Sequence, residues 1–399
     1  MSRLVEIGDV TSKVETWDPL SSISNKPFHY IDISSVDREA KQVSATQLIL
    51  PSDAPSRARQ IVKTGDILVS TVRPNLNAVA EVPKRLNGAI ASTGYCVLRP
   101  YNERVNSRYL YFWVRSTEFI KEMVKRATGA SYPAVSDKIV KDSKIPLLPL
   151  PEQKRIAAIL DKADSIRRKR QEAVLLTEEL LRSVFQDMFG DPVTNPKGWE
   201  IGTVENALES GRLLDVQDGN HGEKHPKVAD FSSDGIPFIM ANCLVNGQLD
   251  TEKAYKLESS WLKKLRVGFA KTGDLLLSHK GTVGEVAIVS DTFPLVILSP
   301  QVTYYRIGTD LDAKFLAGFF STAWFQSILK NEAEQSTRAY IGITRQRLLP
   351  LMLPPIELQR EFACQAAVIE KLMAKYWNTI LENDNLFNSL LQGAFKGIL

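Results

Sequence analysis

The sequence predicts an α+β fold in which two globular domains alternate with two long helices. Two observations support this prediction. Short motifs of the first half recur in the same order in the second half, as in duplicated units. Each half also ends in a long stretch with apolar residues at helical spacing. We place the segments, in chain order, at residues 1–150 (domain), 151–190 (helix), 191–356 (domain) and 357–399 (helix).

The internal repeat is carried by three collinear matches. Residues 5–10 match 199–204, residues 64–70 match 272–278, and Pro149, Leu150 and Gln153 match Pro355, Ile356 and Gln359. The offsets stay between 194 and 208 residues, so the two copies differ by short insertions. A repeat of this kind predicts an internal pseudo-twofold relation between the halves.

Each domain shows strand-like runs separated by turn residues. In the first domain a Thr-Gly-Asp turn at residues 64–66 precedes the predicted strand 67–70, and a second run follows at 95–98. Residues 302–305 occupy the matching place in the second domain, and residues 30–33 form a further strand-like run. Residues 107–126 have the pattern of an amphipathic helix. This mixture is typical of α+β domains.

The two helical segments carry a heptad-like apolar pattern. Pro151 stands at a favourable first helical position, and neither proline nor glycine follows before Gly190. The expected seam residues are Ile156, Leu160, Ala163, Val174, Leu181, Val184 and Met188, and then Phe362, Ala366, Ile369, Met373, Tyr376, Ile380, Phe387 and Leu390. Such spacing favours a coiled coil of two helices about 57 Å long.

An antiparallel pairing of these helices would separate the two domains. Polar residues interrupt both seams, namely Arg167, Arg170 and Thr177 in one helix and Asn383 in the other. Polar seam residues commonly fix the register of a coiled coil. In the antiparallel arrangement we expect Arg167 to lie near Asn383.

Composition excludes several classes of protein. The chain has no apolar run of about 18 residues and no signal-peptide pattern at its start, so we expect a cytoplasmic protein without a membrane segment. Cys96, Cys243 and Cys364 form neither a disulfide framework nor a metal motif. The net charge is +4; residues 1–150 carry +6 and residues 191–356 carry −2. Bulk charge therefore leaves nucleic-acid binding open.

The search for catalytic motifs predicts no catalytic residue. Phosphate-binding loops and nucleotide-binding glycine motifs are absent. Asp32, Glu39 and Lys41 resemble the acidic pattern of Mg²⁺-dependent nucleases, but a strand leading into a polar turn explains them better. His221 and His225 are spaced like a metal pair, yet they lie in a loop-like segment. We therefore expect no metal site.

Three junctions resemble those of the specificity subunits of type I restriction-modification enzymes. PLLPLPEQKRIAAIL at residues 146–160 is similar to the entry into their central helix. MFGDP at 188–192, followed by NPKGW at 195–199, is similar to the exit from it. PPIELQR at 354–360 resembles the second junction. The resemblance covers the order of parts along the whole chain.

The resemblance implies a non-catalytic subunit that reads a bipartite target in double-stranded DNA, one half with each domain. The helices would set the spacing and dock two modification subunits, which use S-adenosylmethionine. Restriction subunits, which use ATP and Mg²⁺, would complete the assembly, and this chain would bind none of these cofactors. A coiled-coil adaptor with protein-binding domains and a self-contained DNA-modifying enzyme are the alternatives.

We expect the DNA-binding residues to lie in polar loops around the repeated strand. Arginine pairs with guanine and asparagine with adenine, while hydroxyl groups suit phosphate contacts. In the first domain the expected residues are Arg57, Arg59, Arg73, Asn75 and Asn77. In the second domain they are His279, Lys280, Thr282, Arg338, Tyr340 and Arg345.

Overall fold

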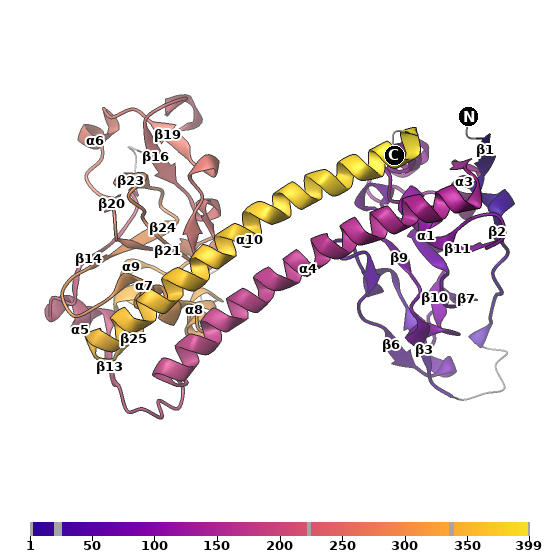
Figure 1. Cartoon of the computed structure of the whole chain (residues 1–399). Coiled ribbons are helices and arrows are strands. Elements are labelled where there is room, and N and C mark those ends of the chain that lie inside the picture. The colour runs from indigo at the N-terminus through magenta and orange to yellow at the C-terminus, as the bar shows by residue number, and fades with distance from the viewer. Residues whose placement is uncertain (1–2, 20–25, 222–224, 335–338, 398–399) are drawn as a thin grey trace. The chain divides into compact units, whose positions relative to one another are not determined.

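The computed structural model describes residues 3–19, 26–221, 225–334 and 339–397. The chain forms two compact units (Figure 1). The first comprises Met1–Ala173 with Tyr376–Leu399, and the second comprises Val174–Lys375. Each unit thus contains one globular domain and about half of each long helix. The sequence-based division keeps the helices as separate segments and remains a prediction.

The first unit contains two four-stranded sheets and two strand pairs. The sheet orders are β6-β3-β10-β7 and β2-β11-β8-β9, and the pairs are β1-β12 and β4-β5. The strands are β1 (Arg3–Glu6), β2 (Thr11–Ser12), β3 (Phe28–Ile31), β4 (Val36–Asp37), β5 (Gln42–Val43), β6 (Gln47–Ile49), β7 (Ala58–Ile61), β8 (Ile67–Ser70), β9 (Val79–Glu81), β10 (Ile90–Ser92), β11 (Tyr95–Pro100) and β12 (Lys144–Leu147).

The helices of the first unit cover one of these sheets. They are α1 (Ser107–Trp113), α2 (Thr117–Arg126), α3 (Asp137–Asp142) and the first half of α4 (Leu150–Phe189). The single helix expected at 107–126 is therefore two, because the Ser116 side chain accepts a hydrogen bond from the Phe119 backbone N–H and caps a new helix there. Tyr109, Phe112 and Leu98 belong to the shared core, together with Leu160 of α4 and Phe387 of the other long helix.

The second unit contains a four-stranded and a five-stranded sheet. Their orders are β14-β24-β21-β22 and β15-β19-β16-β23-β20, with the pairs β13-β25 and β17-β18. The strands are β13 (Glu200–Thr203), β14 (Leu213–Asp218), β15 (Phe231–Ser232), β16 (Ile236–Ile239), β17 (Leu244–Val245), β18 (Gln248–Leu249), β19 (Tyr255–Leu257), β20 (Phe269–Lys271), β21 (Leu275–Lys280), β22 (Thr282–Ile288), β23 (Leu295–Leu298), β24 (Val302–Ile307) and β25 (Pro350–Leu353).

An aromatic core joins the helices of the second unit to its four-stranded sheet. These helices are α5 (Val204–Glu209), α7 (Ala313–Phe320), α8 (Ala323–Glu334), α9 (Ile343–Arg347), the end of α4 and the first half of α10 (Ile356–Lys396). The short helix α6 (Trp261–Lys264) packs instead against the five-stranded sheet. Phe315, Phe319 and Phe320 of α7 are fully buried, as is Tyr305 of β24. The mixed content of helices and strands in both units confirms the predicted α+β class.

The two units arrange their sheets in the same way. In each, the strand after the Thr-Gly-Asp turn pairs antiparallel with a later strand, so that Ser70 faces Tyr95 and Ser278 faces Val302. Each unit also has one parallel pair, β3 with β10 and β16 with β23. The first and last strands pair as well, β1 with β12 and β13 with β25.

The repeated aspartate of the Thr-Gly-Asp turn holds this frame together. Asp66 accepts the Lys63 backbone N–H and pairs with Arg99 at 2.7 Å. Its counterpart Asp274 accepts the Lys271 backbone N–H, and Arg306 lies 2.8 Å away. Both carboxylates are almost fully buried. A buried carboxylate must be paired, which explains why the turn keeps this residue.

The repeated glutamine explains the third matched motif. Gln153 is buried at the start of α4, where it accepts the Asn106 backbone N–H and donates to the Leu148 carbonyl. Gln359 makes the same bonds at the start of α10, with the Asp312 backbone N–H and the Pro354 carbonyl. Each glutamine thus satisfies backbone groups where a domain joins its helix.

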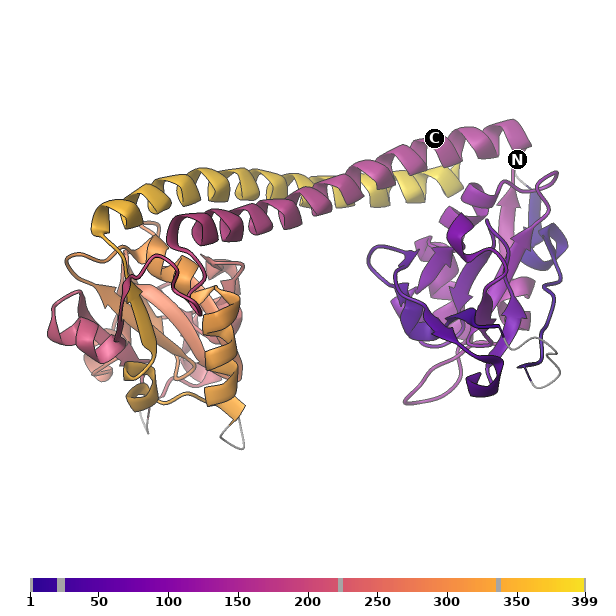
Figure 2. The same ribbon diagram turned by 90° about the horizontal axis from the view of Figure 1, so that it is seen from below.

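The long helices run antiparallel beside each other within each unit. In the first unit Arg167 of α4 lies 3.6 Å from Asp384 of α10, and the Arg170 guanidinium lies over the Tyr376 ring. The observed partner of Arg167 is therefore Asp384, the residue after the expected Asn383. In the second unit the end of α4 lies beside the start of α10 (Figure 2), with the Phe185 and Phe362 rings 5.3 Å apart.

The expected seam residues differ in how far they are buried. Those that are buried are Ile156, Leu160, Val174, Phe362, Ala366, Ile369, Met373, Ile380 and Phe387. Those of intermediate exposure are Ala163, Leu181, Val184, Met188, Tyr376 and Leu390. Ala394, which continues the expected spacing, is buried as well. Phe185, Phe189 and Leu391 are also buried, so the apolar contact is wider than the expected heptad positions. No helix within the described ranges is both long and apolar enough to cross a bilayer.

Candidate nucleic-acid interface

In the first unit an arginine and a tyrosine form an exposed pair beyond the end of β8. The Arg73 guanidinium carbon lies 4.6 Å from the centroid of the Tyr132 ring, a cation–π distance. The backbone of Arg73 is left-handed with φ 49°, and its N–H donates to the Pro133 carbonyl at 2.7 Å. The Tyr132 residue is 68% exposed. The pair therefore joins two loops at the surface.

Backbone hydrogen bonds link this pair to the loop that carries Arg57. The Thr71 N–H and hydroxyl both donate to the Gly94 carbonyl at 2.9 Å. The adjacent Thr93 N–H donates to the carbonyl of Arg57, also at 2.9 Å. Exposed Arg57 thus belongs to the same end of the domain as Arg73. These loops bring together basic side chains that are separate in sequence.

The second unit has a lysine–tyrosine pair at the corresponding place. Lys280, at the end of β21, lies with Nζ 5.7 Å from the centroid of the Tyr340 ring. The two residues form an antiparallel bridge, and the Gly281 N–H donates to the Ala339 carbonyl at 3.1 Å. Gly281 has φ +80°, a conformation that glycine adopts without strain. Both units therefore present a cation beside a tyrosine after the repeated strand.

The remaining predicted residues of the first unit have different environments. Asn75 is exposed. Arg59 is bonded to the Asp18 carboxylate and to the Ser56 carbonyl, so its guanidinium is engaged within the protein. Asn77 donates to the Val114 carbonyl at 2.9 Å and also receives a hydrogen bond from Lys41. We therefore treat Asn77 as a residue that shapes the loop.

The residues of the second unit that were predicted to bind DNA also lie in different environments. Thr282 is exposed on β22, and exposed Arg345 lies 3.8 Å from Glu332. Arg338 lies outside the described residues. His279 has no exposed surface, so the expectation that it contacts DNA directly was wrong. It is the last of five consecutive buried residues of β21, and only Lys280 at the end of this strand is exposed.

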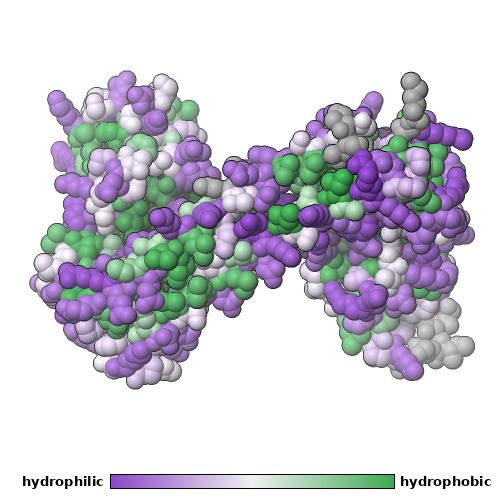
Figure 3. Space-filling model, in the orientation of Figure 1, coloured by the Kyte–Doolittle hydropathy of each residue, from purple (hydrophilic) through white to green (hydrophobic). Residues whose placement is uncertain are grey.

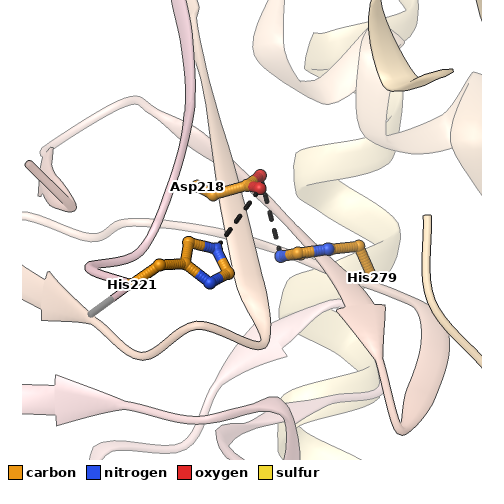
Figure 4. Close-up of side chains that lie close together, drawn as sticks. All are labelled: Asp218, His221 and His279. Atoms are coloured by element: carbon orange, nitrogen blue, oxygen red, sulfur yellow. Dashed lines mark ion pairs between the residues drawn. The ribbon is translucent and has the colours of Figure 1, made fainter. Parts of the chain in front are cut away.

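His279 belongs to a cluster with Asp218 and His221 (Figure 4). Its Nε2 lies 3.7 Å from Asp218 Oδ1, and the Nε2 of His221 lies 3.5 Å from Asp218 Oδ2. Nδ1 of His279 lies 3.1 Å from the Ile341 carbonyl oxygen. Burial lowers the pKa of His279, although the Asp218 charge opposes that shift. His225, whose spacing from His221 resembles that of a metal pair, is not part of this cluster.

The nuclease-like residues serve the local fold. Asp32 follows β3 and caps a short 3-10 helix. Glu39 lies in a turn whose N–H groups bond to Asp37. Lys41 donates to the Asn77 side chain at 3.2 Å, and burial together with the nearby Arg115 charge lowers its pKa to about 8. Among the described residues the cluster of three possible metal ligands is the one around Asp218, so Asp32 and Glu39 offer no comparable site.

Sequence reasoning missed Tyr132 and Asp218. Tyr132 could have been found, because it matches Tyr340 within the repeat at an offset of 208 residues. Asp218 carries no comparable signal. It reaches His279 only through the pairing of β14 with β24 and of β24 with β21.

Comparison with known proteins places this geometry in context. Residues 4–176 match the model of the type I restriction modification DNA specificity domain. The chain resembles type I specificity subunits. A specificity subunit of a type I restriction enzyme from Methanocaldococcus jannaschii is 25% identical over 78% of this chain and 74% of its own length. One from Escherichia coli is 22% identical over 78% and 69%, respectively.

A solved structure resembles the chain over its whole length. It comes from work on complex assembly and conformational transition of the type I restriction-modification system. Its matching chain is 26% identical, covers 100% of this chain and 98% of its own length, and has a TM-score of 0.56. The family match covers residues 4–176, which end within α4. The part of the chain beyond residue 176 is covered by the whole-chain likeness to the solved structure.

Proposed function

We propose that this chain is the DNA-recognition subunit of a type I restriction-modification system and has no catalytic role of its own. The observation that carries the proposal is the matched cation–tyrosine pair at the end of the repeated strand in both units. Two such surfaces on equivalent sheets suit a target with two halves. The similarity to specificity subunits favours this function over a protein adaptor or a self-contained enzyme.

Each pair combines groups suited to DNA. An exposed guanidinium can bond to guanine O6 and N7 in the major groove, and an ammonium group neutralises phosphates. In the first unit we assign base contacts to Arg73 and Asn75 and supporting contacts to Arg57. In the second unit we assign contacts with DNA to Lys280, Thr282, Tyr340 and Arg345, with Lys280 facing phosphate. Holding the cation over a tyrosine ring limits its conformations and so reduces the entropy lost on binding.

The long helices supply the second part of the proposed function. Apolar residues on them remain exposed in the second unit, where Leu175 is 65% and Val368 is 71% exposed. Figure 3 shows apolar surface among polar side chains on one face of this unit. Exposed apolar surface of this kind often marks a protein interface. We assign it to docking of the modification subunits, which would use S-adenosylmethionine, while restriction subunits would use ATP and Mg²⁺.

The helices also account for a fixed distance between the two half-targets. We propose that α4 and α10 form one antiparallel coiled coil, with the two domains related by a pseudo-twofold axis. The length of this coiled coil then sets the spacer, which is the number of base pairs between the two half-targets. The antiparallel contacts inside each unit support this arrangement.

The recognition function can be tested by sequencing the methylome of a host with and without the gene. Loss of a single bipartite methylation motif on deletion, and its return on complementation, is the expected result. A methylome that is unchanged in a host with active modification subunits would contradict the proposal. Deletion of a modification subunit alone is the matched control, because it should remove the same motif.

The spacer can be tested by lengthening both helices together. Seven residues inserted near Thr177 and seven near Met373 preserve the heptad pattern and add about 10 Å, or about three base pairs. The methylated motif should keep both half-sequences and gain a spacer longer by about two to three base pairs. Insertion of four residues rotates the stripe and is the control. An unchanged spacer in a folded, methylating assembly would show that the helices do not set it.

A further inference from the structure

His279 has one ring nitrogen whose bonding the protein alone leaves incomplete. Nδ1 faces the Ile341 carbonyl at 3.1 Å. Because a carbonyl oxygen only accepts, Nδ1 must carry the proton of this hydrogen bond. Nε2 is buried and has no hydrogen-bond partner within the described part of the chain, although it points toward Asp218 at 3.7 Å. In the neutral ring this atom is a lone pair directed at a carboxylate.

Asp218 is held firmly in front of this nitrogen. Its Oδ1 accepts hydrogen bonds from the Thr303 hydroxyl at 2.5 Å and from the Gln346 amide at 3.3 Å. Its Oδ2 faces Nε2 of His221 at 3.5 Å. The residue is only 8% exposed, so its charge has little access to water. A buried carboxylate is costly unless its charge is compensated, so a proton or a cation between Asp218 and the two imidazoles would stabilise this arrangement.

The position of His221 is fixed by its connection to the same sheet. The Gly219 N–H donates to the Val302 carbonyl at 2.9 Å. A Cβ on Gly219 would lie 2.0 Å from the Ser299 carbonyl oxygen, so only glycine allows the chain to approach this closely. His221 follows two residues later, with its side chain directed toward Asp218 (Figure 4).

From these contacts we propose that Asp218, His221 and His279 bind a divalent transition-metal ion, for which zinc is the best match. The three ligand atoms lie within 4.8 Å of one another. Tetrahedral zinc with bonds of about 2.0–2.1 Å separates its ligand atoms by about 3.3–3.4 Å, so small side-chain movements close the site. Two imidazoles and a carboxylate form an established zinc ligand set.

The surroundings of the cluster match those of metal-bound histidines. Ligating histidines usually donate their second N–H to a carbonyl or carboxylate, as Nδ1 of His279 does to Ile341. The hydrogen bonds from Thr303 and Gln346 orient the carboxylate in the same manner. Three protein ligands leave a fourth position for water or another oxygen ligand.

In the first unit, the position that corresponds to His279 is occupied by a threonine and has no such cluster around it within the described residues. Thr71 follows the repeated strand where His279 does in the second unit, and each accepts a backbone hydrogen bond from the returning loop, from Val135 and Ile341 respectively. The Thr71 hydroxyl donates to the Gly94 carbonyl, so its bonding is complete within the protein. The shared frame therefore does not require a histidine here.

A bound ion would connect the candidate DNA-binding tip of the second unit to its sheet. It would join the segment 219–221 to the end of β21, and the His279–Ile341 hydrogen bond extends this link to the loop of Tyr340. The site thus acts as a support for the Lys280–Tyr340 pair. The inference depends on the cluster alone, and it stands or falls separately from the proposed DNA recognition.

The test is zinc binding by the full-length chain. Protein stripped with a chelator is titrated with zinc chloride against a chromophoric competitor, and the metal content is measured after dialysis. We expect about one zinc ion per chain and a raised melting temperature of the second unit. His221→Ala should weaken zinc binding by at least about 100-fold, because removal of outer-shell groups alone commonly costs 10- to 100-fold.

Two further variants make the test specific. His225→Ala is the matched control, since His225 lies in the same segment but outside the cluster, and it should bind zinc like the wild type. His279→Thr places the residue of the first unit at this position and should abolish binding. Circular dichroism confirms that each variant folds. Equal zinc binding by the wild type and His221→Ala, or none by the folded wild type, would overturn the proposal.

Discussion

In the first unit the contact between the long helices and the globular domain includes a buried charge network beside its aromatic rings, whereas the contact described for the second unit centres on stacked and edge-on aromatic rings. Asp164 of α4 lies 3.1 Å from Arg115 of the domain and 3.1 Å from Arg167 of its own helix. In the second unit the ring centroid of Phe189 in α4 lies 4.8 Å from that of Phe315 in the domain and 5.6 Å from that of Phe362 in α10.

The difference shows which parts of the repeat are constrained and which are free to differ. The buried aspartate of the turn and the buried glutamine at the helix start occur in both units, because each satisfies backbone groups of the shared frame. The helix contacts only have to fill space and compensate charge, which different side chains can do. Unlike contacts at the two places also disfavour pairing of the helices in a wrong register.

Exchange of residues 191–356 for the second domain of a relative should change the methylated DNA motif more than any single substitution. If the two domains read DNA independently, one half of the methylated motif should change completely while the other half stays the same. Methylome sequencing of the hybrid gives the result. The reciprocal exchange of residues 1–150 is the control and should alter only the other half. Changes in both halves from one exchange would contradict independent reading.

Replacement of Asp164 by alanine should strongly destabilise the first unit. It leaves the Arg115 guanidinium, now without its carboxylate, in a buried environment, a change that costs about 3–5 kcal/mol. Hydrogen exchange resolved along the chain should show faster exchange in residues 156–173 and little change in the second unit. Glu152→Ala, which removes an exposed pair with Arg155, is the control. Unchanged exchange in the Asp164 variant would show that the network does not stabilise the unit.

The same network predicts a pH dependence for the first unit alone. Burial tends to raise the pKa of Asp164, but the neighbouring arginines, Arg115 foremost, bring the pKa below its ordinary value. Its stabilising contribution is therefore complete above the unfolded pKa of about 3.9 and is lost as the pH falls through the lower folded value. Exchange protection of residues 156–173 should fall in this acidic range in the wild type, and the Asp164→Ala variant should lack that part of the change.

Replacement of Arg73 by alanine should reduce specific DNA binding by about 1–3 kcal/mol if its guanidinium reads a base. Affinity for sequences altered at that one base pair should then become similar to affinity for the target. Fluorescence anisotropy with matched and substituted duplexes measures both effects. Glu103→Ala, another exposed position of this unit, is the control. Wild-type affinity in a folded Arg73 variant would remove it from the interface.

Lys280→Ala should have a smaller effect that differs in kind. An ammonium group beside a tyrosine neutralises phosphate more readily than it reads a base. Binding should weaken to a similar degree for all sequences, and the slope of log affinity against log salt should fall by about one. A loss confined to one base position would instead make Lys280 a base-reading residue and the two tips functionally alike.

Local sequence patterns were sufficient for the long helices and for part of the sheets. The helical segments predicted at 151–190 and 357–399 contain the long helices Leu150–Phe189 and Ile356–Lys396, apart from a residue or two at their ends, because apolar periodicity and the junction prolines act within a few residues. The predicted strand 67–70 is β8. The helix break at Ser116 was missed, since a single capping serine inside an amphipathic stretch has little weight in a periodic pattern.

The sequence by itself determined the fold class, the two long helices, and the loops that carry basic residues. The tertiary structure alone decided which of those residues face solvent. His279 is buried although its neighbour Lys280 is exposed, and Asp218 meets it across 61 residues of sequence through the pairing of three strands. Strand order and register set such contacts, and they depend on the packing of the whole sheet, which no local pattern encodes.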